Sequence, residues 1–124
     1  MPSPRRALGD FGEAAARTRL LHAGYRILAS NWRCRHGEID LVAQQGDQIV
    51  FVEVRTRRQA GPVPPEESLS PTKRARLLTL AAAYLAEAGL PSNTSCRIDL
   101  MAVEIDRTGR ISRLDQIINA VEES

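Results

Sequence analysis

The sequence predicts an α+β fold, also describable as α/β, in which a mixed central sheet is flanked by helices. Two helical segments, from about Leu8 to Ala23 and from Pro71 to Ala88, enclose three strand-like segments, and a fourth strand-like segment follows the second helix. In this order, helix, three strands, helix, strand, the second helix must return the chain to the sheet, for which a right-handed crossover is the default. With 124 residues and 43% hydrophobic content, the chain suits a single domain spanning residues 1–124.

The first helix is predicted to begin at Leu8 or Gly9, after a flexible start over residues 1–7, and to be closed by Gly24. Alanines in its middle favour helix. Hydrophobic residues at helical spacing indicate the face that packs against the sheet. The predicted apolar stripe consists of Leu8, Phe11, Ala15 and Leu21.

The second helix has clear boundary signals, with Ser70 as N-cap, Pro71 at its first position and Gly89 after its end. Residues 57–70 are predicted to be a long loop, because they are polar and contain three prolines that forbid a long regular element.

The strands are predicted from the alternation of apolar and polar residues and from the abundance of β-branched residues. Tyr25 to Trp32 is followed by two strands, 37–42 and 50–55, which form a hairpin because Gly46-Asp47 is a two-residue turn signal. Cys96 to Ile105 is the next strand, and the chain ends with a turn and an amphipathic segment, 111–121.

The hairpin places acidic groups on facing strands. If the turn consists of Gly46 and Asp47 alone, Asp40 lies opposite Glu53 and Glu38 lies opposite Arg55, all on one face. Opposed like charges are destabilising. A divalent cation bound by the oxygens of these carboxylates would offset their repulsion, and the pair would then form a metal-binding site.

These residues resemble the PD-(D/E)xK nuclease signature, in which an acid is followed by Glu-x-Lys on the next strand. More narrowly, the chain is similar to the small bacterial YraN family of predicted endonucleases, relatives of the archaeal Holliday-junction resolvases. The resemblance covers nearly the whole chain. Its motifs here are residues 9–13, Asn31-Trp32-Arg33, Gly37 to Leu41, Phe51 to Arg57, Lys73 and Arg97-Ile98-Asp99.

The resemblance implies a restriction-endonuclease-like core and a metal-dependent deoxyribonuclease. It implies that Asp40 and Glu53 bind Mg²⁺ or Mn²⁺, helped by the Val54 carbonyl and by Glu13 directly or through water. Without the resemblance, a solvated helix residue is the favoured interpretation of Glu13. A cross-strand ion pair of Glu38 with Arg55 is weighed equally with metal contact by Glu38. Asp99 is interpreted as a structural partner of Arg97.

One position departs from the family pattern, which usually has Lys where this chain has Arg55. An arginine cannot lose its proton in a protein, but it can hold a phosphate and stabilise developing charge. Lys73, the single lysine of the chain, lies just after the hairpin and its loop and is the alternative source of the basic group.

Basic residues gather near the second helix. Cations in its first two turns are disfavoured by the helix dipole, by roughly 0.3–1 kcal/mol each, so a phosphate is the expected partner. A solvated charged face is the competing interpretation. The expected nucleic-acid contacts are Arg33, Arg35, Arg57, Arg58, Lys73, Arg74 and Arg76.

The composition of the chain weighs against several classes of protein. The net charge of +2 requires DNA affinity to come from clustered arginines, and 4% aromatic content weighs against a base-stacking RNA or single-strand binder. Two cysteines are too few for a disulfide framework. No apolar segment is long enough for a membrane span and the start lacks a secretory pattern, so we expect a cytoplasmic protein.

Two functional hypotheses follow from the sequence. The first is a metal-dependent endonuclease that hydrolyses phosphodiester bonds in DNA, in a branched or otherwise structured form. The second is a non-catalytic nucleic-acid-binding or assembly protein that retains the nuclease fold, which Arg55 in place of Lys supports. A homodimer is expected only by analogy with enzymes that cut two strands symmetrically.

Overall fold

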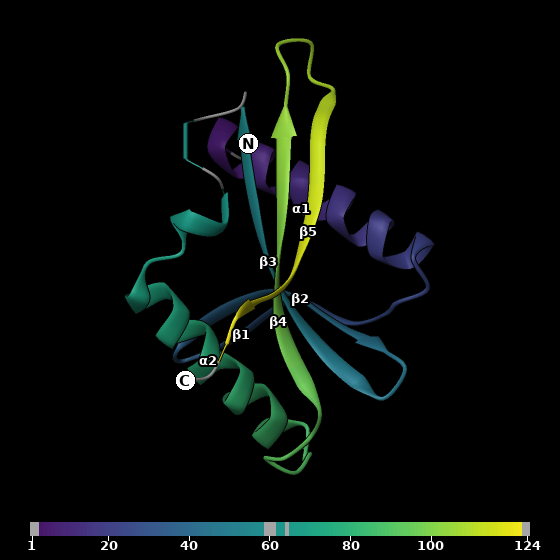
Figure 1. Cartoon of the computed structure of the whole chain (residues 1–124), viewed down its shortest axis with the longest axis vertical. Helices are drawn as coiled ribbons and strands as arrows, with labels where there is room; N and C mark the ends of the chain where they lie inside the picture. The colour runs from purple at the N-terminus through teal and green to yellow at the C-terminus, as the bar shows by residue number, and fades with distance from the viewer. Residues whose placement is uncertain (1–2, 59–61, 64, 123–124) are drawn as a thin grey trace.

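The computed structural model of the chain describes residues 3–58, 62–63 and 65–122 (Figure 1). In chain order its elements are α1 (Pro4–His22), β1 (Arg26–Cys34), β2 (Gly37–Gln45), β3 (Gln48–Arg58), the 3₁₀ turn η1 (Pro65–Ser68), α2 (Pro71–Glu87), β4 (Cys96–Ile105) and β5 (Ile111–Val121).

The strands form one mixed sheet in the order β1-β2-β3-β4-β5. All neighbours are antiparallel except β3 and β4, which are parallel and joined by the crossover through α2. The predicted fold class is therefore confirmed. Figure 1 shows α1 crossing β3, β4 and β5 in the upper part of the view and α2 at the lower left.

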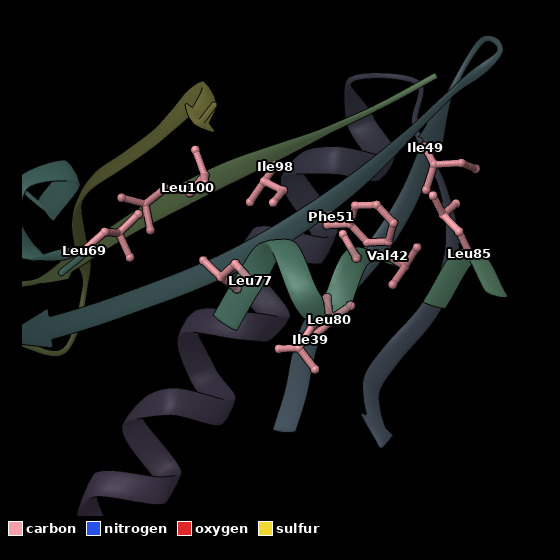
Figure 2. Close-up of a cluster of buried hydrophobic side chains, with 12 residues drawn as sticks. Ile39, Val42, Ile49, Phe51, Leu69, Leu77, Leu80, Leu85, Ile98 and Leu100 are labelled. Carbon is pink, nitrogen blue, oxygen red and sulfur yellow. The ribbon is translucent and has the colours of Figure 1, made fainter. Parts of the chain in front are cut away.

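Each helix covers one face of the sheet, as adjacent residues of β3 show. Phe51 packs in a cluster with Leu77 and Leu80 of α2, whereas Val52 packs with Leu20 of α1. Figure 2 shows the α2 side, where leucines of the helix point into a group of aliphatic side chains around Phe51. Because successive side chains of a strand point to opposite faces, β3 contributes to both cores.

The second helix agrees with its predicted boundaries. Ser70 is the N-cap, and its hydroxyl accepts a hydrogen bond of 3.1 Å from the Lys73 backbone N–H. This cap fixes the first turn of α2, and with it the position of Lys73.

Two predicted segments have the wrong bounds. The flexible start over residues 1–7 is incorrect for the described residues, because α1 begins at Pro4 with Ser3 as its cap. The predicted loop over residues 57–70 is shorter, because β3 continues to Arg58 and η1 follows. Residues 1–2, 59–61 and 64 lie outside the described residues.

The predicted apolar stripe of α1 is also wrong. The buried residues of the helix are Gly12, Ala16 and Leu20, whereas Phe11 and Leu21 are 46% and 51% exposed. The reason is close approach of the backbones: a Cβ atom added to Gly12 would lie 1.8 Å from Oγ1 of Thr56 on β3. Small residues, rather than the largest apolar ones, define the face of α1 that contacts the sheet.

This close approach predicts that Gly12→Ala destabilises the protein by several kcal/mol, since overpacking costs about 1–3 kcal/mol or more and here meets a side chain held on a strand. Gly9→Ala is the matched control on the same helix. Nothing lies within 4 Å of its added Cβ, so it should stabilise the helix by up to about 1 kcal/mol. Urea unfolding measures both, and equal stability of the two variants would contradict the packing described here.

Candidate active site

The β2–β3 hairpin has the predicted register. Gln45 pairs with Gln48 next to the turn, and the ladder continues as far as Leu41 opposite Val52. It stops there, so the predicted pairing of Asp40 with Glu53 falls at the first position beyond the ladder. The two strands diverge at the acidic residues.

The Asp40 side chain occupies the point of divergence. Its Oδ2 accepts a hydrogen bond of 2.8 Å from the Val54 backbone N–H. Had the ladder continued in register, that N–H would have faced the Ile39 carbonyl. The carboxylate therefore replaces a backbone acceptor and ties β2 to β3 where regular pairing has ended.

The pKa of Asp40 is raised from 3.8 to about 7, first by burial and then by the neighbouring Glu53 carboxylate. Glu13 of α1 and Glu38 of β2 raise it further, and the hydrogen bond from Val54 opposes the shift. Four carboxylates from three elements thus act on one another around Asp40. Without a cation, the Asp40 carboxyl is therefore partly protonated at near-neutral pH.

Glu53 is the most enclosed of these four acids, with 7% of its surface exposed. Lys73 Nζ lies 3.2 Å from its Oε2, and Arg55 Nε lies 3.5 Å from the same oxygen. Arg55 is on the same face of β3, two residues further along, and Lys73 comes from the first turn of α2. The two candidate basic groups therefore converge on one carboxylate oxygen. Among the residues that the structure describes, the buried Nε of Arg55 has no hydrogen-bond partner.

Glu38 does not form the predicted cross-strand pair with Arg55. Its Oε1 accepts a hydrogen bond of 2.8 Å from Nδ2 of Asn31, and Arg33 Nε lies 3.7 Å away. The prediction is wrong because β2 has already left β3 at this level and has turned Glu38 toward β1.

Burial raises the pKa of Glu13, and a hydrogen bond with the Asn31 side chain lowers it in part. The sequence does not identify Asn31 as a site residue, although Asn31 belongs to the Asn-Trp-Arg motif of the family. A mid-strand asparagine carries no spacing signal that would place it beside two acids.

A pocket of about 460 Å³ lies between α1 and the β1–β2 pair. Acids form part of its wall, and two arginines, one from α1 and one from β1, line it as well. Its lining consists of Arg6, Gly9, Asp10, Glu13, Asn31, Arg33, Glu38, Asp40 and Val54.

Some of the predicted nucleic-acid contacts have structural partners. Arg74 donates to the backbone carbonyls of Leu69 and Ala120, which anchors α2 to β5. Arg57 pairs with Glu104 at 2.9 Å. These two guanidinium groups therefore make structural contacts within the protein.

The other predicted contacts lie closer to the surface. Arg33 is 69% exposed, and Arg35, Arg58 and Arg76 are exposed as well. Arg76 lies beside the β1–β2 turn, since its Cδ is 3.7 Å from where a Cβ of Gly37 would be. Arg76 of α2 thus lies beside the turn that carries Arg35.

Asp99 has the structural role expected for it. It is fully buried, and Arg97 Nε donates to its Oδ1 at 3.0 Å. Gln116 and the Asn119 backbone N–H also donate to its carboxylate. This network joins β4 to β5 and is separate from the pocket.

Within residues 3–58, 62–63 and 65–122, no three His, Cys, Asp or Glu side chains are grouped tightly enough to hold a metal ion by themselves. The available donors are the carboxylates of Asp40 and Glu53 and the Val54 carbonyl. This set fits Mg²⁺ or Mn²⁺, since Mg²⁺ usually keeps several waters and takes only one or two carboxylates from the protein. The pKa of Asp40 is raised first by burial and second by the Glu53 carboxylate, and a cation bound between the two acids would oppose both effects.

Fold and site together define an α+β protein with a mixed sheet and a partly buried acidic pocket where two strands diverge. Residues 12–103 match the model of the uncharacterised protein family UPF0102, and the chain belongs to that family. This confirms the family, that of the YraN proteins, which the motifs indicated.

Close relatives match over almost their full length. A UPF0102 protein of Chloroflexus aurantiacus is 51% identical over 123 residues, 99% of each chain. One from Roseiflexus castenholzii is 47% identical over 124 residues, 100% of each chain, and one from Moorella thermoacetica is 49% identical over 97% of this chain and 99% of its own.

Among solved structures, Pyrococcus furiosus SfsA in complex with Ca²⁺ is similar with a TM-score of 0.45 and 16% identity. The match covers 96% of this chain, which spans 65% of the SfsA chain. In the part of the chain that the structure describes, neither helix has the length and apolar character to cross a membrane.

The raised pKa of Asp40 predicts that the metal-free protein loses stability as the pH rises. The folded state retains a proton that the unfolded chain releases between the two pKa values, 3.8 and about 7. The free energy of unfolding should therefore fall across this range, by up to about 4 kcal/mol, and change little from this group above it.

Asp40→Asn tests this prediction, because it removes the charge but keeps an acceptor for the Val54 N–H. Urea unfolding between about pH 5 and about pH 8 should show that the variant lacks most of the slope and is more stable than the parent at the upper end. Asp47→Asn, in the exposed β2–β3 turn, is the control and should behave like the parent. A variant that is less stable than the parent at the upper end would indicate that Asp40 is held by a structural ion pair.

Proposed function

We propose that this protein is a metal-dependent endonuclease that hydrolyses phosphodiester bonds in DNA. The observation that carries the proposal is the Asp40 carboxylate, which is largely enclosed beside Glu53 where β2 leaves β3 and has a pKa of about 7. A raised carboxylate pKa at a strand divergence beside a pocket is a combination that functional sites commonly show.

Asp40, Glu53 and the Val54 carbonyl would hold the cation, with water completing its coordination. Glu13 would accept a hydrogen bond from that water rather than bind the cation directly, because its side chain already interacts with Asn31. A bound Mg²⁺ or Mn²⁺ would supply a water of lowered pKa and stabilise charge on the phosphate.

The basic groups would position the scissile phosphate. Arg55 and Lys73 both approach Glu53 Oε2, so a phosphate bound at the metal would lie within reach of either side chain. Arg55 can hold and neutralise the phosphate through its planar fork of donors. Lys73 can do the same and can also transfer a proton.

DNA is the substrate that the surroundings of the site favour. Exposed arginines line the pocket and the β1–β2 turn, where they suit a phosphate backbone. The restriction-endonuclease-like core implied by the PD-(D/E)xK resemblance also favours DNA, and the proposal includes the cytoplasmic location that the sequence predicts. By the same analogy we extend the proposal to branched or structured DNA cut by a homodimer.

A second candidate, a non-catalytic nucleic-acid-binding or assembly protein, is favoured by one observation. Glu53 already has two cationic partners, so its charge is compensated without a metal. In that case Glu53 would hold α2 against β3 as a structural partner of Lys73. The arginines alone would then carry the function, which would be nucleic-acid binding.

Cleavage of a DNA panel separates the candidates. Junction, flap, linear duplex and single-stranded DNAs are incubated with Mg²⁺, Mn²⁺ or chelator, using the parent and Asp40→Asn. The nuclease proposal expects metal-dependent cleavage of at least one substrate by the parent and a loss of about 10²-fold or more in the variant. Binding of DNA by both proteins without cleavage under any metal would leave the binding protein as the function.

The roles of the two basic groups are separable by paired substitutions. If Arg55 holds the phosphate, Arg55→Ala should lose most activity while Arg55→Lys retains or increases it. If Lys73 provides the group, Lys73→Ala should abolish cleavage, and Lys73→Arg should rescue it only where charge suffices. Cleavage rates under single-turnover conditions decide between them. Parent-like rates for both alanine variants would exclude both residues.

A further inference from the structure

Asn31 has an unusual backbone for a residue in the middle of a strand. Its φ is 52°, in the left-handed region, which non-glycine residues adopt at an energetic cost. Ser30 pairs with Leu41 and Trp32 pairs with Ile39, but Asn31 and Asp40, which lie between them, are not paired. β1 therefore breaks its ladder opposite the residue at which β2 also leaves β3.

The break turns the Asn31 carboxamide toward the acidic pocket that it lines. Its Nδ2 donates to Oε1 of Glu38 at 2.8 Å, and its side chain is near enough to Glu13 to lower the pKa of that carboxyl. These two acids come from β2 and α1 and line the same pocket as Asp40, so one carboxamide lies between acids of two elements. Backbone strain persists only where the surroundings enforce it, and it is concentrated at functional sites.

We propose that Asn31 is a positioning residue, whose carboxamide holds the Glu13 and Glu38 carboxylates at the pocket wall as acceptors for the waters of a divalent cation bound at Asp40 and Glu53. This inference rests on the proposed function. Residues that orient the outer shell of a metal site affect its affinity although they never touch the ion.

The test is Mn²⁺ titration by calorimetry with the parent and Asn31→Gly. Glycine adopts the left-handed conformation without strain, so the variant removes the carboxamide and preserves the backbone. We expect Mn²⁺ affinity to fall by about tenfold or more, as for other outer-shell substitutions. Urea unfolding of the metal-free variant should show no comparable loss of stability.

Asn119→Gly is the matched control. Asn119 is the other described non-glycine residue with positive φ, 57°, and its backbone N–H and side chain bond Asp99 and Glu122 instead of the pocket acids. The same substitution in the same backbone region should leave Mn²⁺ affinity unchanged. An equal loss in both glycine variants would assign the effect to backbone flexibility and overturn the inference.

A double-mutant cycle with Glu38→Gln tests whether Asn31 acts through the acids. Because the Glu38→Gln variant no longer offers a carboxylate at this position, Asn31→Gly should cost clearly less Mn²⁺ affinity in that background than in the parent. Equal losses in the two backgrounds, or parent-like affinity of Asn31→Gly, would refute the positioning role while the metal site stands. A parent that binds no Mn²⁺ would overturn both this inference and the proposed function.

Discussion

The site depends on one hydrogen bond, from the Val54 backbone N–H to the Asp40 carboxylate. An antiparallel pair that ends in mid-sheet leaves backbone donors without acceptors, and a buried donor must find one. Asp40 supplies the acceptor from its own side chain, so β2 separates from β3 at a defined residue. The same bond holds the Asp40 carboxylate in a partly buried position beside Glu53, where burial first and the Glu53 charge second raise its pKa.

The helices complete the site through their packing on opposite faces of the sheet. α1 approaches β3 at Gly12, whose missing side chain leaves room for Thr56, and this contact brings Glu13 to the pocket. α2 begins at Pro71 after its N-cap Ser70, and this start places Lys73 Nζ 3.2 Å from Glu53 Oε2. Charges of both signs therefore reach the point of divergence from elements far apart in sequence.

Much of this arrangement could be predicted from local sequence rules. The turn at Gly46-Asp47 sets the hairpin register, and the Ser70-Pro71 signal sets the start of α2, because both depend on neighbouring residues alone. The face of α1 could not be predicted from hydrophobicity, since it is decided by a steric contact with a strand. The role of Asn31 depends on a left-handed backbone conformation that an asparagine permits but does not require.

The most direct test of the account is a crystal structure of the protein grown with Mn²⁺, in which anomalous scattering locates the ion. The account predicts a peak bonded to carboxylate oxygens of Asp40 and Glu53 and to the Val54 carbonyl, with water completing the coordination. No peak at the site, with Lys73 still paired to Glu53, or an ion bound only elsewhere, would contradict it.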